Sequence, residues 1–313
     1  MKRFCFLVFL VLNSVCGHTQ DTHFSQIFSN PVYLNPAFAG YDGCSRINTA
    51  YRLQWPNISG RYHIANVSYD QLFGKAHGVA VNYDFDMGAK TLQTHAVSII
   101  YAPTIKLFKG KLKISPAVQL GWRANYIDWS QLTFGEMIDP RYGFVYSPNM
   151  SPPKTESHMF DLSTGLILSH HNLVYGAAFH HITQPNEGFS GVSRLPIKYT
   201  GHITYTAIIS DKYRISPSFV GQNQQDFISF LTTLTSYIYG ARIGIGYRGN
   251  VNNPDAILFM VGYQGKGFKV GYSYDLTIST LTNRTGGSHA LSLSYRFNCK
   301  NREHRKGVEQ IAF

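Results

Sequence analysis

The sequence predicts an all-β protein, a closed antiparallel transmembrane β-barrel of about fourteen strands with a short non-strand N-terminal arm. Apolar and polar residues alternate with a period of two along most of the chain, which is typical of half-buried strands. The links between these segments alternate between tight turns and longer loops. Tyr (21), Phe (21) and Gly (28) are abundant, charged residues make up only 14%, and no apolar run after residue 17 is long enough for a spanning helix. A chain of this kind would cross a membrane as strands.

Residues 1–17 are expected to be a cleavable signal peptide. Lys2 and Arg3 precede an apolar run from Phe4 to Leu12, and the residues around Cys16 are small or modest in size, as a signal peptidase requires. The run is too short to span the ~30 Å of hydrocarbon in a bilayer. The residue before Cys16 is Val, where lipidated chains usually carry Gly, Ala or Ser. Export followed by cleavage is therefore expected.

Residues 18–44 are expected to form a periplasmic arm ahead of the first strand. Two Asn-Pro pairs, Asn30-Pro31 and Asn35-Pro36, interrupt it. Proline cannot donate to a sheet, and the residue before it avoids the helical region, so neither a strand nor a long helix fits. One short turn capped by Asn35 is expected. The arm would pack against or into the barrel's periplasmic mouth or dock on a partner, with a disordered leader as the alternative; the candidate contact residues are Phe24, Phe28, Tyr33, Leu34 and Phe38.

The barrel is expected to occupy residues 45–298. Alternation is clearest in residues 196–210, 268–277 and 291–298, where one face is apolar and the other polar. Most segments reach the roughly 9–11 residues that a tilted transmembrane strand needs. The expected strands are 45–55, 61–73, 77–86, 92–104, 112–127, 158–169, 173–182, 195–209, 213–223, 227–239, 241–248, 256–264, 267–278 and 289–298.

The links between these segments favour an outer-membrane barrel over a soluble sandwich. Every second link is a tight turn, and the others include the long stretches 128–157 and 183–194. Outer-membrane barrels have an even number of strands, short periplasmic turns and longer extracellular loops. Aromatic residues near segment ends would form interfacial girdles, with filling of a soluble core as the alternative: Trp55, Trp122, Tyr126 and Tyr295. Pro103, Pro116 and Pro217 lie within segments and are interpreted as bulges or frayed strand starts near the short-turn rim.

Charged residues of the strands are expected to face the lumen, because Arg or Lys facing lipid at mid-depth costs ~2–4 kcal/mol. They would line a water channel or pair across the lumen, and a mostly blocked lumen is favoured over an open pore. The inward set is Arg52, Asp84, Asp86, Arg123, Asp161, Lys198, Arg242, Arg248, Lys269, Asp275 and Arg296.

No constellation in the sequence indicates an enzyme, a cofactor or a metal. A nucleophile elbow and a phosphate-binding loop followed by a helix are both missing. The pairs His170-His171 and His180-His181 are ten residues apart, about 33 Å at strand rise, so they cannot share one ion. They are interpreted as interfacial or rim histidines. The net charge of +11 comes from scattered cations, which makes nucleic acid a poor candidate partner.

Removal of the signal would leave two cysteines, Cys44 and Cys299. Cys44 directly precedes the first expected strand and Cys299 follows the last, and these two strands are neighbours in a closed barrel. A disulfide is therefore expected in this oxidising compartment, with two free thiols as the alternative. Residues 299–313 are expected to form a basic periplasmic tail that is solvated or docks an acidic surface.

Several phrases across the chain resemble the PorP/SprF family of outer-membrane proteins associated with type IX secretion. They are residues 21–26 (DTHFSQ), Asn30-Pro31, 34–37 (LNPA), 51–56 (YRLQWP), 180–186 (HHITQPN), 272–276 (YSYDL) and 286–289 (GGSH).

The resemblance implies a non-enzymatic barrel in the cell outer membrane that works through protein partners. These would be periplasmic secretion and gliding components, with a peptidoglycan-binding protein as a candidate among them, and cargo or an adhesin at the cell surface. The barrel would anchor, help export or help display such surface proteins. A general porin or solute-transport barrel is the alternative, because it would share every feature except the family phrases.

Overall fold

The computed structural model describes residues 21–139, 141–146, 154–210, 212–250, 253–279 and 282–297. The expected signal peptide, 1–17, and the basic tail, 299–313, lie outside these residues. Within the described part of the chain, no helix is both long and apolar enough to cross a bilayer.

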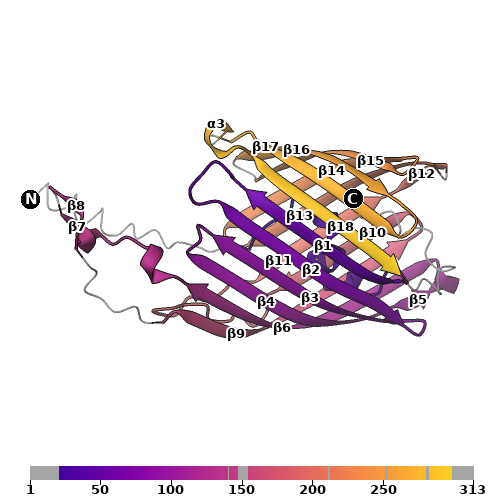
Figure 1. Ribbon diagram of the computed structural model, residues 1–313. Helices are drawn as coiled ribbons and strands as arrows, with labels where there is room; N and C mark the ends of the chain where they lie inside the picture. The colour runs from indigo at the N-terminus through magenta and orange to yellow at the C-terminus, as the bar shows by residue number, and fades with distance from the viewer. Residues whose placement is uncertain are drawn as a thin grey trace, which may run out of the picture.

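The chain folds into a closed antiparallel barrel with a wall of fourteen strands (Figure 1). Strands consecutive along the wall pair with each other, and β1 closes the barrel against β18 with Ser45 opposite Phe297. The predicted fold is confirmed. The wall strands are β1 Ser45–Gln54, β2 Tyr62–Phe73, β3 His77–Gly88, β4 Leu92–Pro103 continued by β5 Ile105–Leu107, β6 Leu112–Ile127, β9 Glu156–His170, β10 Leu173–His180, β11 Lys198–Tyr205 continued by β12 Ala207–Ser210, β13 Tyr213–Gln224, β14 Phe227–Ile238, β15 Ala241–Asn250, β16 Pro254–Gln264, β17 Phe268–Thr277 and β18 Ser288–Phe297.

Pro116 and Pro217 each interrupt the hydrogen bonding with one neighbouring strand. Neither proline forms a bulge, because each pairs with its other neighbour without a shift of register. Pairing of β4 and β5 with β6 stops after Tyr101↔Val118 and resumes in the same register at Ile105↔Ile114. The gap lies opposite Pro116, which has no N–H to donate. The break between β11 and β12 lies opposite Pro217 in the same way. A hydroxyl pair bridges each gap: Thr104 with Ser115 at 3.0 Å, and Thr206 with Ser216 at 3.2 Å.

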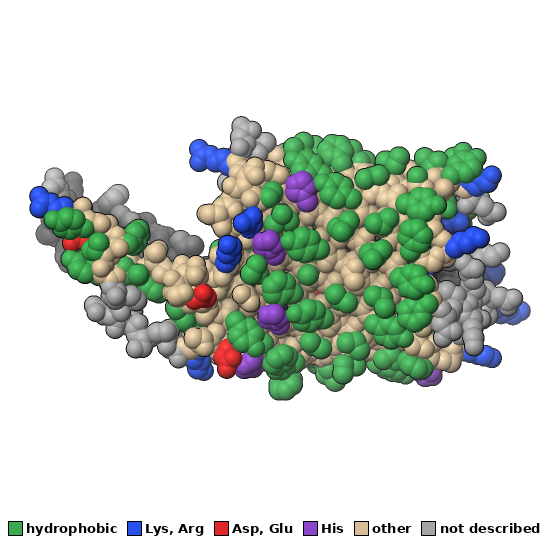
Figure 2. All heavy atoms as spheres, viewed as in Figure 1, with side chains coloured by type: hydrophobic (Ala, Val, Ile, Leu, Met, Phe, Trp, Pro, Cys, Tyr) green, Lys and Arg blue, Asp and Glu red, His purple; other side chains and the backbone are tan. Residues whose placement is uncertain are grey.

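The outer wall is apolar over most of its height, as a lipid-facing surface requires (Figure 2). Ile99 and Leu120 expose 63% of their side chains there, and the aromatic residues Trp122, Tyr126 and Tyr295 also face outward. The charged residues predicted to face the lumen are all buried or half-buried. The barrel therefore lies in the outer membrane, with its polar side chains inside.

The long links gather at one end, the extracellular end by the convention of such barrels. The link from β6 to β9 extends away from the barrel and carries the turns η4 Trp129–Gln131 and η5 Gly135–Met137 and the hairpin of β7 Ile138–Asp139 with β8 Gly143–Phe144 (Figure 1). The link from β17 to β18 holds α3 Thr282–Thr285. At the opposite, periplasmic end, η3 Phe108–Gly110 follows β5.

The N-terminal residues form three short helical turns in place of a strand. They are η1 Ile27–Ser29, α2 Pro31–Leu34 and η2 Pro36–Phe38. Each of the two later turns begins with a proline, whose missing N–H costs nothing at that position. The side chain of Asn35 caps η2 by accepting from the Ala37 N–H at 2.9 Å, as the Asn-Pro pair predicts.

Candidate functional site: the occupied lumen

Residues 21–44, here called the luminal segment, lie inside the barrel. Asp21 contacts His181, which follows β10 at the extracellular end, and Gly40 donates to Asp70 near the periplasmic end of β2. The segment therefore runs through the barrel's interior from one half to the other. The sequence predicts an arm on the periplasmic side that packs against or into the barrel's mouth or docks on a partner. In the structure the segment extends further, to the extracellular half, because the wall offers it polar and apolar partners along this whole path.

The predicted contact residues of the segment are enclosed by the wall. The exposed fractions are 3% for Phe24, 5% for Phe28, 1% for Leu34 and 2% for Phe38. Tyr33 is partly buried, packs edge-on against Phe24 at 5.0 Å between ring centroids and donates to the Thr22 carbonyl at 2.6 Å. Phe28, Leu34 and Phe38 form one apolar core with inward-facing wall residues such as Ile100, Ile167 and Leu258. Phe24 and Tyr33 pack in a second, smaller cluster with Ala50 and Ile64. Removing these apolar side chains from water stabilises the segment inside the barrel.

Glycines of the wall make room for the segment's backbone. A Cβ at Gly78 would lie 2.0 Å from the Ala39 carbonyl oxygen, and one at Gly165 would lie 2.1 Å from Asn35 Oδ1. A Cβ at Gly176 would lie 2.1 Å from His202 Nε2 and 2.8 Å from Asn35 Nδ2. Any side chain at these three positions would collide with the segment or with the groups that hold it. The wall is thus shaped for this occupant.

Asn35 joins the segment to the wall at mid-path. It is fully buried, and its Nδ2 donates to the carbonyls of Leu166 at 3.2 Å and Ala177 at 3.1 Å, and lies 3.2 Å from His202 Nε2. The ring of His202 stacks on Phe38 with centroids 5.3 Å apart. One amide therefore bridges β9, β10 and β11.

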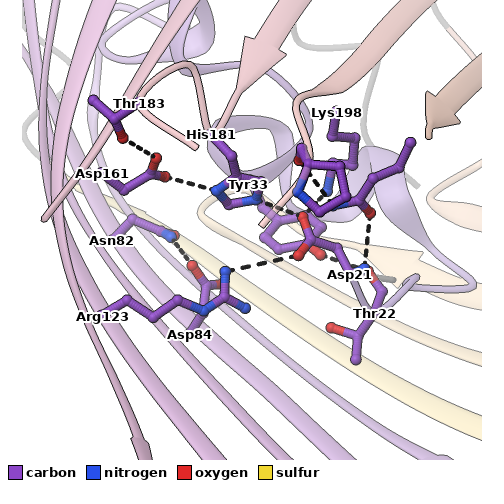
Figure 3. Close-up of polar contacts among 12 residues, drawn as sticks. Asp21, Thr22, Tyr33, Asn82, Asp84, Arg123, Asp161, His181, Thr183 and Lys198 are labelled. Atoms are coloured by element: carbon purple, nitrogen blue, oxygen red, sulfur yellow. Dashed lines mark hydrogen bonds and ion pairs between the residues drawn. The ribbon is translucent and has the colours of Figure 1, made fainter. Parts of the chain in front are cut away.

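A cluster of charges holds the first described residue, Asp21 (Figure 3). Its carboxylate lies 2.7 Å from His181 Nε2, 2.9 Å from Lys198 Nζ and 3.7 Å from Arg123 Nη1. His181 Nδ1 lies 2.8 Å from Asp161 Oδ2, so the imidazole bridges two carboxylates. Buried charges of this kind are tolerated only when they are paired.

The electrostatics of the cluster keep Asp21 ionised. Burial alone would raise the pKa of the Asp21 carboxyl, but His181, Lys198 and Arg123 hold that pKa well below its usual range. Burial opposes a charge on His181, yet the carboxylates of Asp21 and Asp161 raise its pKa above the ordinary value. The partly buried ring of His23 behaves differently: burial and the cations Lys198, Arg248 and Arg52 lower its pKa to about 3, so it is neutral.

A second group of contacts lies around Asp275 of β17. Ser25 donates to Asp275 Oδ2 at 2.7 Å, and the same oxygen pairs with Arg52 at 3.2 Å and Arg248 at 2.9 Å. Arg52 also donates to the His23 carbonyl. The next residue of the segment, Gln26, accepts from Ser292 at 2.5 Å.

A third group holds the segment's periplasmic end. Arg46 pairs with Asp70 at 2.9 Å, and Asp42 lies 3.9 Å from Arg46 and 3.7 Å from Arg296. Gly40 adopts a left-handed φ of +64° that suits glycine, and its N–H donates to Asp70 at 3.1 Å. The segment is thus fixed at both ends and in the middle.

A small cavity of about 80 Å³ remains beside Tyr33 and Asp21, with room for several water molecules. Asp84, Asp86 and Arg123 are among its lining residues. Across the described residues, no three His, Cys, Asp or Glu side chains are grouped so that they could hold a metal ion.

Some predicted positions differ from the structure. His180 and His181, interpreted as interfacial or rim residues, are both buried at 7% exposure. His181 has a φ of +60°, which ends the strand alternation and lets its ring turn inward to Asp21 and Asp161. Cys44 is buried just before β1, while Cys299 lies outside the described residues, so their disulfide stays a prediction.

Sequence reasoning missed Asp21, Ser25, Gln26 and the wall glycines as contact residues. Asp21, Ser25 and Gln26 all lie in the DTHFSQ phrase that contributed to the family resemblance, so the phrase was the available signal. Nothing in a single sequence separates Gly78, Gly165 and Gly176 from ordinary strand glycines.

The family profile described as "Type IX secretion system membrane protein PorP/SprF" matches residues 17–295, most of the chain. The chain belongs to the PorP/SprF family. The match includes all fourteen wall strands, apart from the last two residues of β18, and the whole luminal segment. The predicted family is confirmed, and with it the assignment to a type IX secretion membrane component.

Solved structures with a similar fold are outer-membrane proteins. The CymD monoaromatic hydrocarbon channel matches with a TM-score of 0.54 and 12% identity, over 87% of this chain and 94% of that one. The Ralstonia pickettii toluene transporter TbuX matches with a TM-score of 0.51 and 13% identity, over 87% and 95%. At these identities the likeness concerns the barrel fold alone. No curated protein matches this chain in sequence.

Proposed function

We propose that this PorP/SprF protein is a non-enzymatic component of the type IX secretion and gliding machinery that anchors, helps export or helps display surface proteins such as adhesins. Its partners would be periplasmic secretion and gliding components, including a peptidoglycan-binding protein, and cargo at the cell surface. The observation that carries the proposal is a lumen occupied by the protein's own residues 21–44. A barrel whose lumen is filled in this way would act by binding other proteins at its two rims.

The contacts of the luminal segment argue against solute transport as the main activity. A general porin needs a continuous water path, whereas Asn35, Phe38 and Leu34 fill the middle of this lumen at 2% exposure or less. At Gly78 and Gly165 the segment fills the space that a side chain of the wall would take, and at Gly176 His202 and Asn35 fill it. Displacing the segment to open a path would separate Asp21 from His181 and Lys198, buried charge pairs that are costly to break. It would also break the hydrogen bond from Ser25 to Asp275.

The hairpin of β7 and β8 supports a contact with a surface protein. Its exposed fractions are 73% for Tyr142, 62% for Phe144 and 55% for Tyr146, on a loop that extends away from the barrel (Figure 1). Asp139 holds the hairpin by accepting from the Tyr142 N–H at 2.9 Å and the Tyr146 hydroxyl at 2.8 Å. Exposed aromatic groups held in a defined shape are typical of protein interfaces.

Affinity purification of the detergent-solubilised chain from its own cells tests the proposal. We expect periplasmic secretion or gliding proteins and an exported adhesin to co-purify with the wild type. Replacing Tyr142, Phe144 and Tyr146 by Ser should remove the adhesin and keep the periplasmic proteins. The matched control is Val192→Ser, a change at another exposed apolar residue (80%) on a different long loop. Solute uptake by the purified chain, with no secretion protein attached, would favour the porin alternative.

A further inference from the structure

Three histidines face outward near the extracellular end of one side of the barrel. They are His63 on β2, His95 on β4 and His289 on β18, each within the first four residues of its strand. His63 and His289 both lie opposite Leu53 of β1, so the two rings flank one residue in the same row. Figure 2 shows histidines along this end of the wall, with Lys and Arg beyond them.

Each imidazole is held by a tyrosine of the neighbouring strand. Nδ1 of His63 lies 2.7 Å from the Tyr51 hydroxyl, Nδ1 of His95 lies 2.8 Å from that of Tyr83, and Nδ1 of His289 lies 2.7 Å from that of Tyr272. When the hydroxyl donates to Nδ1, the ring proton resides on Nε2. Three oriented Nε2–H donors then face the surroundings of the barrel.

Cations stand beyond these rings on three consecutive extracellular links: Arg284, Arg61 and Lys90, all exposed. The links touch each other, because Asn57 N–H donates to the Thr285 carbonyl and Ala89 N–H donates to the Arg61 carbonyl. Among the described residues of β18 to β4 and their extracellular links, no carboxylate faces outward; Asp70, Asp84, Asp86 and Asp275 all point into the lumen. This arc of the wall is therefore basic.

The rest of the extracellular end differs in charge. Asp128 and Glu156 are exposed beyond β6 and β9. His158 of β9 faces outward like the other three, but its Nε2 lies 3.6 Å from Glu156 Oε2 and its ring stacks on Trp122. The β6 to β9 side also carries the exposed cations Arg141 and Lys154, so its acids and cations offset each other. An anion would thus be attracted more strongly to the β18 to β4 arc, where none of the described carboxylates faces outward.

The position of the three rings relative to the membrane indicates that the bound anion is part of a lipid. Along the same columns toward mid-membrane, the next outward residues are apolar and exposed, such as Val97 at 40%, Leu291 at 53% and Leu293 at 49%. The rings therefore mark the level where acyl chains meet headgroups, which is where tyrosine girdles lie.

We propose that this arc, His63, His95 and His289 with Arg61, Lys90 and Arg284, binds the phosphate groups of phosphorylated lipids in the outer leaflet. The Nε2–H groups donate to phosphate oxygens at the membrane surface, and the three cations pair with the same phosphates from above. The arc holds a defined lipid against β18 to β4 and fixes the barrel's orientation and depth there.

The test measures lipid binding to the purified full-length chain by native mass spectrometry, with bisphosphorylated lipid A as the probe and the same lipid after removal of its phosphates as the comparison. We expect the wild type to bind the phosphorylated lipid about tenfold more tightly. Changing His63, His95 and His289 to Phe together should remove most of this preference. Arg61→Gln with Lys90→Gln should weaken it through the cations alone.

Two matched controls keep the test specific. His77→Phe removes the same Tyr–His pair, with Tyr101 at 2.8 Å, from the periplasmic end, and His158→Phe removes the outward histidine beside Glu156. Both controls should bind the phosphorylated lipid like the wild type, and every variant should retain the heat-modifiable gel mobility of a folded barrel. Equal wild-type binding of both lipids, an unchanged triple variant, or a similar loss in His77→Phe would overturn the proposal.

Discussion

The side chain of Asn35 offers the sharpest test of how the luminal segment is held. The change Asn35→Ala removes two donations from Nδ2, to Leu166 and Ala177, and one acceptance by Oδ1 from Ala37. At about 1 kcal/mol for each buried hydrogen bond, the docked segment loses roughly 3 kcal/mol. That loss raises the population of the undocked segment about a hundredfold.

Hydrogen–deuterium exchange of residues 21–44 in detergent measures this population directly. We expect the backbone amides of the segment to exchange about a hundredfold faster in Asn35→Ala, while the amides of the wall strands stay protected. The barrel should keep its heat-modifiable gel mobility, because the fourteen-strand ladder does not depend on Asn35.

Asn30 provides the matched control within the same segment. It also precedes a proline and is fully buried, but within the described part of the chain its Nδ2 and Oδ1 have no hydrogen-bond partner. Asn30→Ala therefore loses no side-chain hydrogen bond and should change exchange by less than about fivefold. Equal acceleration in the two variants, or none in Asn35→Ala, would refute the role given to the Asn35 amide.

Three further outcomes are expected. Protonation of His23 should loosen the segment as pH falls from 6.5 toward 3, because an undocked His23 gains a proton near its ordinary pKa of about 6.5 while the docked ring, with a pKa of about 3, does not. The raised pKa of docked His181 acts in the opposite direction, so the effect of His23 is the difference between the wild type and His23→Gln. Between neutral pH and pH 5.5, the undocked population of the wild type should rise up to about tenfold more than that of His23→Gln, in exchange corrected for intrinsic rates. Gly78→Ala should expose the segment to protease, because its Cβ would lie 2.0 Å from the Ala39 carbonyl oxygen. Gly201→Ala should leave digestion unchanged, because apart from its chain neighbours no described residue has an atom within 4 Å of the added Cβ. Cys44 and Cys299 should form a disulfide, seen as a mass increase of the intact chain on reduction, and an unchanged mass would mean two thiols.

The wall could be predicted because its signals are local. The period of two marks the faces of each strand, and the alternation of tight and long links sets the antiparallel order. Residues 112–127, for example, were expected as one strand and form β6 with the same bounds. The two Asn-Pro pairs likewise excluded a strand and a long helix, because proline limits its own φ and its neighbour's. They predicted only one short turn, capped by Asn35, where the structure has three.

The position of the luminal segment could not be predicted, because it depends on contacts between residues far apart in sequence. Asp21 meets His181, 160 positions away, and Ser25 meets Asp275, 250 positions away. The strand pattern also failed at His181, since a single residue with positive φ turns its ring away from the expected face. The sequence around Gly165 does not mark it as special. Glycine is needed there because the side chain of Asn35 occupies the space that a Cβ would take.

Electrical recording of the purified chain in a planar lipid bilayer tests most directly whether the luminal segment closes the barrel. With Leu34, Asn35 and Phe38 filling the lumen, the wild-type protein should show no large steady conductance under moderate voltage, and deletion of residues 21–38 should produce one if the barrel still assembles. A large steady conductance from the wild-type chain, unchanged by that deletion, would contradict an occupied lumen and favour a porin.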